Sequence, residues 1–247
     1  MELWDYKSPG LQHRTVDHMF PRRVLTSPDS NPWPHLRRNI PHRWYTDDRD
    51  RLVGFISTDE AAILYGNAAI FAGQAGVEIG CWRGWSSAHI ITAGIQLDII
   101  DPVLAKPEFR TELQCLVQTL DAEIQTRLYG YTSPAALRTA KALRGAPWSF
   151  AFIDGNHEKP APFNDARAVA ELMSNDALIL FHDLSSPDVA EGLNILRVSG
   201  WSTMVYMTMQ IMGVAWRGKV NPVTHVPDPR IKWELPSHLD IYSVCGM

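Results

Sequence analysis

The chain has 247 residues, of which 45% are hydrophobic and 20% are charged, a balance typical of a globular protein with one domain and extensions. Its formal net charge of −4 argues against a nucleic-acid surface. The three cysteines stand far apart with no Cys-x-x-Cys pair, so neither a disulfide framework nor a thiolate zinc site is indicated. The amino terminus has no basic and apolar signal pattern and no apolar run approaches a membrane span, so we expect a cytoplasmic protein without a membrane partner.

Residues 1–57 are expected to form an irregular arm. Prolines recur through this segment, and Pro32-Trp33-Pro34 fits neither a helix interior nor a central strand. Aromatic residues such as Trp33 and Trp44 indicate that the arm is ordered, because such residues are scarce in disordered segments. We expect the arm to pack on the core or on a partner subunit, with direct covering of a substrate as the alternative.

The first convincing helix is predicted from Thr58, which is interpreted as its N-cap, with acids in the first turn. Gly73 ends this helix. Its apolar face is formed by Ala61, Leu64, Ala68 and Phe71.

Residues 76–91 read as a strand, a glycine turn with Gly80 and Gly84, and a second helix. Glycines at these places let the backbone turn sharply and approach a ligand without a Cβ in the way. The helix that follows would direct its first N–H groups into the same space, and Glu78 adds a carboxylate near the end of the strand. Helix amides on one side and a carboxylate on the other suit a zwitterion such as an amino acid.

Strands and helices alternate along the rest of the chain. Further strands are predicted over residues 96–102, 124–128, 148–154 and 177–183. Four further helices are predicted between and after these strands. The first carries an apolar stripe of Leu113, Leu116, Leu120 and Ile124, and the second begins at Ser133-Pro134. The third has its apolar face at Phe163, Ala166, Ala170 and Met173, and the fourth has Val189, Leu193 and Leu196 and ends near Gly200. Residues 201–208 and 210–216 read as adjacent strands of a hairpin.

This alternation predicts an α/β fold with a Rossmann-like, doubly wound and mostly parallel sheet of seven strands that ends in an antiparallel hairpin. We divide the chain into the arm at 1–57, the α/β domain at 58–217 and a proline-punctuated tail at 218–247. Ligands bind such sheets at the carboxyl ends of the strands. Asp101 stands at one of these ends, where the fold places the carboxylate that hydrogen-bonds ribose hydroxyls.

Two further strand ends carry acids beside histidines, in Phe152-Ile-Asp-Gly-Asn-His157 and Leu180-Phe-His-Asp183. Neighbouring strands would bring Asp154 and Asp183 into one cleft, where their hard oxygen ligands suit Mg²⁺ or a similar divalent ion better than zinc. His157 and His182 are candidate general bases, because imidazole titrates near neutral pH. His182 packed as a structural histidine is the alternative.

The pattern Glu-x-Gly-x-x-x-Gly-x-Ser over residues 78–86 resembles motif I of the class I S-adenosylmethionine-dependent methyltransferases. From about residue 54 to 217, the chain resembles the small family within that class that includes macrocin O-methyltransferase-type enzymes. It shares with that family the phrases Phe-Ile-Asp-Gly-x-His and Phe-His-Asp, and Asp165 matches an acid usual in the family's next helix.

The resemblance implies an S-adenosylmethionine site and a metal site. It assigns the cofactor to Glu78, Gly80, Gly84, Ser86, Asp101, Thr132 and Asp154. By similarity to catechol O-methyltransferase, it assigns a metal to Asp154, His182 and Asp183, with histidine as a departure at one ligand position. His157 falls where the catechol enzyme has its catalytic lysine.

We therefore expect Mg²⁺-assisted O-methylation of a small hydroxylated metabolite, in secondary metabolism. The aromatic and arginine residues of the arm leave an aromatic or an acidic acceptor open. The alternatives are an iron-dependent hydroxylase-like relative on the same fold and a cofactor-binding protein without catalysis. A homodimer is expected from the tryptophan-bearing arm and the tail.

Overall fold

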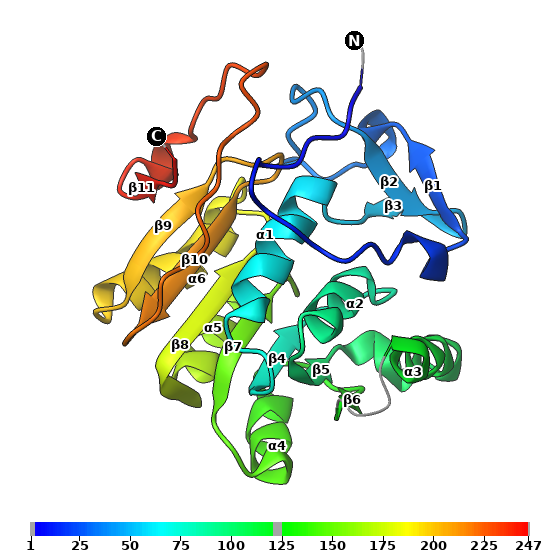
Figure 1. Ribbon diagram of the computed structural model, residues 1–247, viewed down its shortest axis with the longest axis vertical. Coiled ribbons are helices and arrows are strands. Elements are labelled where there is room, and N and C mark those ends of the chain that lie inside the picture. The colour runs from blue at the N-terminus through cyan, green and yellow to red at the C-terminus, as the bar shows by residue number, and fades with distance from the viewer. Residues whose placement is uncertain (1–2, 121–124, 247) are drawn as a thin grey trace.

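The computed structural model describes residues 3–120 and 125–246. An eight-stranded sheet lies between two layers of helices, and a separate three-stranded sheet sits above one edge of it (Figure 1). Across the described residues, none of the helices has the length and apolar character needed to cross a membrane.

The large sheet has the strand order β11-β9-β10-β8-β7-β4-β5-β6. Strands β4 to β8 pair in parallel, whereas β10 runs antiparallel to both β8 and β9. Seven strands and the terminal hairpin match the prediction, and the eighth strand is a two-residue addition from the tail that pairs in parallel with β9. The strands are β4 (Ala75–Ile79), β5 (Gln96–Ile100), β6 (Arg127–Tyr129), β7 (Trp148–Ile153), β8 (Met173–Phe181), β9 (Ser202–Tyr206), β10 (Met212–Arg217) and β11 (Ser243–Val244).

Helices cover both faces of this sheet, as a doubly wound fold requires. They are α1 (Thr58–Ala69), α2 (Trp85–Thr92), α3 (Pro107–Leu120), α4 (Ala135–Arg144), α5 (Ala161–Ala170) and α6 (Pro187–Val198). Because side chains alternate along a strand, Phe150 and Phe152 of β7 pack in one core with α1 and α2. Ala151 and Ile153 pack in the other core with α4, α5 and α6. In Figure 1, α1 lies in front of the sheet and α5 and α6 lie behind it.

Some predicted helix boundaries were wrong by a few residues. Thr58 is the first helical residue of α1, and the N-cap is Ser57, which forms a capping box with Glu60. Ser133 does not cap α4, because Pro134 stands directly before that helix and no side-chain cap bond is made. Met173 belongs to β8, where it pairs with Trp148.

The third predicted strand begins at Ile124, which lies outside the described residues; the strand itself, β6, spans Arg127–Tyr129. Short 3₁₀ turns complete the connections, at Asp17–Met19, Pro28–Ser30, Pro102–Ala105 and Ser237–Leu239.

The arm is more regular than its prolines predicted. It forms an antiparallel sheet of β1 (Arg23–Thr26), β2 (Trp44–Asp47) and β3 (Asp50–Gly54). The arm's prolines all lie outside these three strands, where proline removes no ladder hydrogen bond, so they do not prevent the sheet from forming.

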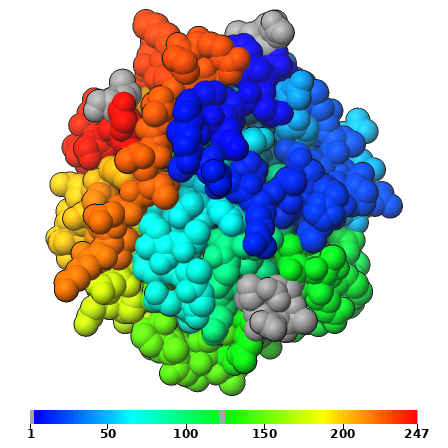
Figure 2. Space-filling view, in the orientation of Figure 1, coloured from blue at the N-terminus to red at the C-terminus, as the bar shows by residue number. Residues whose placement is uncertain are grey.

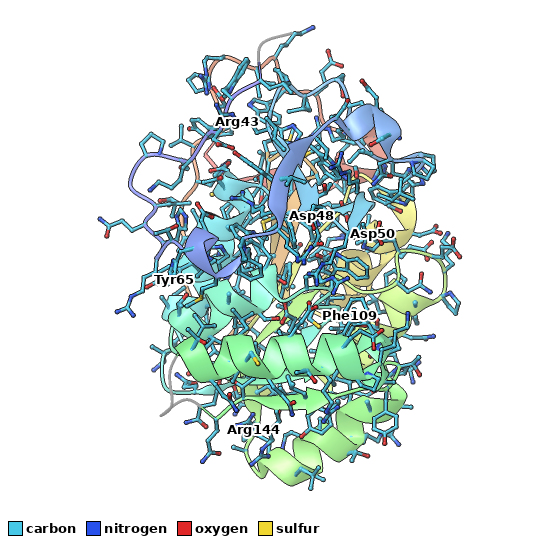
Figure 3. The ribbon with its side chains drawn as sticks, turned by 90° about the vertical axis from the view of Figure 1, so that its right-hand side faces the viewer. Arg43, Asp48, Asp50, Tyr65, Phe109 and Arg144 are labelled. Atoms are coloured by element: carbon cyan, nitrogen blue, oxygen red, sulfur yellow. The ribbon has the colours of Figure 1, made fainter. Side chains whose placement is uncertain are left out.

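The arm is fastened to two other parts of the molecule. Its first residues lie against the C-terminal segment, as Figure 2 shows in dark blue and orange, and the Tyr6 hydroxyl donates to the Val226 carbonyl at 2.7 Å. The β2–β3 hairpin lies above the start of α3 in Figure 3, where Asp48, Asp50 and Phe109 are labelled, and Arg49 pairs there with Glu112. The arm is therefore part of the domain's surface rather than an appendage.

A buried ion pair holds the end of the sheet opposite the predicted ligand site. Arg144 of α4, labelled at the lower edge of Figure 3, forms a fork with both carboxylate oxygens of Asp98, at 2.7 and 2.9 Å. The indole N–H of Trp148 donates to the same carboxylate at 2.8 Å. This network ties α4 to β5 and β7, and it leaves the carboxyl ends of the strands free for other chemistry.

Candidate functional site

A cavity of about 600 Å³ opens where β4, β5, β7 and β8 end. Its wall combines the strand ends with residues of the arm and of the loop between β9 and β10. Most of the predicted site residues lie in this wall, namely Gly80, Ser86, Asp101, Thr132, Asp154, His157, His182 and Asp183. Among the described lining residues, Glu78 and Gly84 are not found.

The glycine turn between β4 and α2 needs both of its glycines. Gly80 has φ +82°, and a Cβ there would lie 2.1 Å from the Asp154 carbonyl oxygen. Gly84 has φ +85° as the N-cap of α2, and a Cβ there would lie 2.4 Å from the Leu113 side chain. Gly80 thus permits close contact between two strand ends at the cavity, whereas Gly84 permits packing against α3.

Glu78 lies beneath the cavity wall rather than in it. Its side chain is fully buried, and its carboxylate accepts hydrogen bonds from the hydroxyls of Ser86, at 2.5 Å, and Ser87. Burial raises the pKa of Glu78 to about 8. In this arrangement Glu78 ties β4 to the first turn of α2, so a contact between its carboxylate and a ligand's amine stays a prediction.

Asp101 organises the glycine turn from the end of β5. Its Oδ2 accepts the backbone N–H groups of Cys81 at 2.8 Å and Trp82 at 3.1 Å, while its Oδ1 accepts the N–H of Val103. The carboxylate also faces the cavity and keeps further lone pairs for a ribose hydroxyl. Thr132 lines the same side of the cavity.

Acids and histidines meet at the ends of β7 and β8. His182 Nδ1 lies 3.5 Å from Asp154 Oδ1 and 3.3 Å from Asp183 Oδ2. His157 Nε2 lies 3.3 Å from each of the same two oxygens. The structure therefore brings Asp154 and Asp183 together, as the sequence predicted, and His157 and His182 lie beside them.

The charges in this cluster shift one another's pKa values. Burial by itself would lower the pKa of His182, but Asp183, Asp154 and Glu60 raise it well above its usual value. Burial would raise the pKa of Asp154, but His182 and His157 hold it below its usual range. Strong mutual perturbation inside a cavity is typical of functional sites.

Two residues of this cluster were missed by the sequence analysis. Glu60 of α1 is 1% exposed, and its Oε2 lies 3.3 Å from His182 Nε2. Gln210, in the β9–β10 loop, donates its backbone N–H to Glu60 and its side-chain N–H to Asp183 at 2.7 Å. In the sequence, Glu60 carries only the signal of a helix capping box with Ser57, and Gln210 carries none.

The cluster fits a divalent metal ion. One ligand atom from each of Asp154, His182 and Asp183 lies within 4.8 Å of the others. The buried ring nitrogens of His182 have no well-formed hydrogen bond in the described structure, so Nδ1 is available to a cation while Nε2 faces Glu60. Two carboxylates and one imidazole are a donor set that suits Mg²⁺, Mn²⁺ or Fe²⁺.

The backbone at this point has an unusual conformation. Asp183 has φ +61°, a left-handed conformation that few residues other than glycine adopt and that aspartate tolerates better than most. The conformation turns the chain so that the backbone N–H of Leu184 bonds to the Ile211 carbonyl while the Asp183 carboxylate bonds to Gln210. Backbone strain of this kind is common at functional sites.

The arm and α5 complete the wall. The ring of Trp33 lies 5.1 Å from that of His157, and Trp44 and Phe55 line the cavity beside it. Asp165 of α5, which the family resemblance pointed to, is 3% exposed and lines the cavity, and burial raises its pKa. The arm packs on the domain and also bounds the cavity, while its covering of a substrate stays a prediction.

Comparison with known proteins agrees with this geometry. Residues 77–184 match a family model described as a methyltransferase domain. These residues run from β4 to the end of β8 and include the glycine turn and Asp154, His157, His182 and Asp183.

Solved structures of O-methyltransferases have the same fold. The O-methyltransferase TomG from Streptomyces achromogenes, involved in tomaymycin synthesis and solved with SAM, has a TM-score of 0.56 at 15% identity, over 66% of this chain and 82% of that one. A putative caffeoyl-CoA O-methyltransferase from Staphylococcus aureus has a TM-score of 0.55 at 11% sequence identity, over 66% of this chain and 85% of that one. The O-methyltransferase from Bacillus cereus, solved with SAH, has a TM-score of 0.51 at 10% sequence identity, over 66% of this chain and 83% of that one.

Residues 77–184 thus match a methyltransferase domain, and the chain has the fold of solved O-methyltransferases. The narrower resemblance to the macrocin-type family is not confirmed by these similarities.

Proposed function

We propose that the protein transfers a methyl group from S-adenosylmethionine to a hydroxyl of a small metabolite, with the help of a divalent cation, for which Mg²⁺ is the best candidate. One observation carries the proposal: a single cavity joins the glycine turn to the acid–histidine cluster. A cofactor bound at the turn would therefore lie beside an acceptor held at the cluster.

The cofactor half of the site comprises the residues around the glycine turn. This part of the cavity is lined by Gly80, Ser86, Asp101 and Thr132. The first backbone N–H groups of α2, at the positive end of the helix dipole, would face the same region. When bound, S-adenosylmethionine supplies an electrophilic methyl group, which goes to the acceptor oxygen with S-adenosylhomocysteine as the co-product. The chain's own contribution is to orient this group and to exclude water.

The metal half comprises Asp154, His182 and Asp183. A divalent ion held there would supply positive charge that lowers the pKa of an acceptor hydroxyl. We assign the role of general base, which accepts the hydroxyl proton, to His157, whose Nε2 lies 3.3 Å from two of the carboxylate oxygens. Trp33, in contact with His157, shields this end of the cavity from bulk water.

Calorimetric titration tests the proposal in two steps. The protein is titrated with S-adenosylmethionine in Mg²⁺ and then in EDTA, and turnover is measured with a panel of hydroxylated compounds. We expect micromolar cofactor binding in both conditions, and turnover only with the metal. Absence of cofactor binding in both conditions would reject the methyltransferase assignment.

The variant Asp154→Ala tests the metal role. We expect it to abolish turnover while S-adenosylmethionine still binds, because the acid cluster lies beside the cofactor half. Asp240→Ala, at an exposed aspartate of the tail, is the control and should keep both properties. Unchanged turnover in Asp154→Ala would remove the metal from the proposal.

We also expect the protein to form a homodimer, and light scattering measures its molecular mass in solution.

A further inference from the structure

We propose that Gln210 is a positioning residue that couples the binding of the divalent ion to the docking of the arm beside the cavity. Its side chain lies between Asp183, a proposed ligand of the ion, and the backbone of the arm at Arg37. The inference rests on the proposed function, because it concerns the ion that the proposal assigns to the strand ends. It adds a link between two parts of the site that are far apart in the chain.

Gln210 is bonded at both ends of its side-chain amide, and the residue is 2% exposed. Its Oε1 accepts the backbone N–H of Arg37 at 2.9 Å, and its Nε2 donates to Asp183 Oδ1 at 2.7 Å. A backbone N–H can only donate and an ionised carboxylate can only accept, so the two partners together fix which end of the amide carries the oxygen. Gln210 therefore acts on the ion through Asp183, since its own amide oxygen is turned toward the arm.

The two carboxylate oxygens of Asp183 have different partners. Oδ1 accepts the bond from Gln210, whereas Oδ2 lies 3.3 Å from both His157 Nε2 and His182 Nδ1. The bond from Gln210 thus holds one oxygen and leaves the other directed at the place where the ion would bind. A hydrogen bond to a ligating carboxylate fixes its orientation, and the loss of such a partner typically weakens metal binding by about 10- to 100-fold.

The backbone at Gln210 is held from two directions. Its N–H donates to Glu60 at 3.0 Å, and its carbonyl accepts the N–H of Ser185 at 3.2 Å. The next residue, Ile211, has φ +61°, which is unusual for a β-branched side chain, and such a conformation persists only where the surrounding contacts maintain it. A substitution confined to the side chain of Gln210 should therefore change its amide contacts and leave the loop in place.

The arm also contacts this part of the site by packing. Beside Gln210, the arm and the β9–β10 loop share a small buried cluster, made of Leu36, Ile40, Trp44 and Met209. Trp33 packs against this cluster, and its ring centroid lies 5.1 Å from that of His157. The segment of the arm that bonds to Gln210 is thus the same segment that lines the cavity.

These contacts make ion binding and arm docking favour each other. The ion needs Asp183 in the orientation that Gln210 holds, and Gln210 is held in turn by an N–H of the docked arm. An arm that moves away leaves the buried amide oxygen of Gln210 without this partner, at a cost in free energy. Because coupling between two equilibria is reciprocal, the ion should order the arm by the same factor by which the docked arm strengthens ion binding.

The variant Gln210→Met tests the positioning role, because methionine has a similar length and volume and removes both amide bonds. Calorimetric titration with Mg²⁺ in the presence of S-adenosylhomocysteine measures affinity for the ion without turnover. We expect the Kd to rise at least about 10-fold. Gln96→Met is the matched control: it loses the bond from Gln96 to the Gly73 carbonyl, at the opposite end of the sheet, and it should bind the ion as the unaltered protein does.

Amide hydrogen exchange tests the coupling. In the unaltered protein and in Gln96→Met, saturating Mg²⁺ should slow exchange over residues 30–43 of the arm. In Gln210→Met, measured at its own saturating concentration of Mg²⁺, this slowing should be lost. A purely structural role of Gln210 would instead raise exchange equally with and without the ion.

A second variant loosens the arm without changing a charge. Leu36→Ala removes packing from the cluster that the arm shares with the loop, so we expect it to weaken Mg²⁺ binding severalfold. When Leu36→Ala is added to Gln210→Met, no further weakening should follow, because the link is already broken. Additive losses in the double variant would show that the arm acts on the ion by a route other than Gln210, which would overturn the coupling.

The outcomes separate this inference from the proposed function. If Gln210→Met binds Mg²⁺ as tightly as Gln96→Met, the positioning role is overturned while the proposed function stands. If Mg²⁺ slows exchange in the arm equally in both variants, the coupling through Gln210 is overturned. Absence of Mg²⁺ binding by the unaltered protein in the presence of S-adenosylhomocysteine would overturn the metal half of the proposed function, and this inference with it.

Discussion

His182 has carboxylates on both sides of its ring. Nδ1 faces Asp154 and Asp183, while Nε2 lies 3.3 Å from Glu60. A carboxylate that holds the far nitrogen of a metal-binding histidine fixes the orientation of its ring and its tautomer. Glu60 is therefore a positioning residue for the proposed ion, and the backbone N–H of Gln210 holds it in place.

We expect Glu60→Gln to weaken Mg²⁺ binding by about 10- to 100-fold, because the amide keeps the shape of the side chain and loses its charge. The measurement is calorimetric titration with Mg²⁺ in the presence of S-adenosylmethionine. Glu158→Gln, at an exposed glutamate next to His157, is the control. If the two variants bind the ion equally well, Glu60 has no positioning role.

A second buried histidine links protonation to stability. His89 of α2 is 1% exposed, and neither ring nitrogen has a hydrogen-bond partner among the described residues. Burial, with smaller effects from nearby His13 and Arg23, lowers the pKa of His89 to about 3. Because this value lies below the unfolded-state value near 6.5, neutral His89 contributes stability above pH 6.5 and loses it as the pH falls from 6.5 toward 3.

The free energy of unfolding should therefore decrease with acidification below pH 6.5 by up to about 1.4 kcal/mol per pH unit from this residue. We expect His89→Leu to flatten this part of the pH dependence, and His18→Leu, at an exposed histidine, to leave it unchanged. Urea midpoints at pH 7.5, 6.0 and 5.0 measure the slopes. Equal slopes in all three proteins would contradict the assignment.

At the scale of elements, the glycine turn is where three strand ends are joined. Asp101 at the end of β5 accepts the N–H groups of the turn, and the Gly80 backbone lies against the Asp154 carbonyl at the end of β7. Glu78 then connects β4 to α2 through the hydroxyls of Ser86 and Ser87. The shape of the cofactor half thus depends on backbone contacts that leave no room for a side chain.

Gly80→Ala should destabilise the protein more than the matched change Gly145→Ala. Both glycines have positive φ, +82° and +76°, but a Cβ at position 145 meets nothing within 4 Å. We expect a loss of about 1–2 kcal/mol for Gly145→Ala from its backbone conformation alone, and at least about 3 kcal/mol for Gly80→Ala, whose Cβ meets backbone atoms. Urea denaturation measures the free energy of unfolding of both variants, provided that the m-value stays constant. Equal losses of stability would show that the clash of the Cβ at position 80 with the Asp154 backbone is relieved.

At the scale of the molecule, Arg37 joins three segments that are far apart in the chain. Its backbone N–H donates to the Gln210 side chain at 2.9 Å, and its guanidinium reaches the carbonyls of Thr208, Met209 and Glu234. Burial lowers the pKa of Arg37 to about 10, which leaves it charged at neutral pH. Arg37 therefore links the arm, the β9–β10 loop and the tail beside the cavity.

We expect Arg37→Met to speed amide hydrogen exchange both in the arm, over residues 30–43, and in the loop at 207–211, because both lose their shared partner. The loss of stability should be about 1–3 kcal/mol. Arg38→Met is a matched control, since among the described residues the Arg38 guanidinium bonds to carbonyls of its own loop, at Asn31, Trp33 and Leu36. Exchange confined to the arm in both variants would refute the joining role.

Sequence reasoning reached the fold because its signals are local. Alternating strands and helices, and the acids and histidines that follow β7 and β8, depend on periodicity and on position within an element. The small sheet of the arm was missed because prolines recur through that segment, although all of them lie outside its strands. Glu60 and Gln210 were missed because they come near His182 and Asp183 only when α1 and the β9–β10 loop fold over the strand ends.

The sequence by itself determined the doubly wound sheet, the glycine turn and the four acid and histidine residues at its carboxyl edge, because each follows from spacing within one element or from the shared direction of parallel strands. Only the tertiary structure decided that the arm bounds the cavity, that its arginines are directed to backbone carbonyls, and that Glu78 lies below the wall. These features depend on packing between segments up to about two hundred residues apart, as between Arg37 and Glu234, and no local pattern specifies such packing.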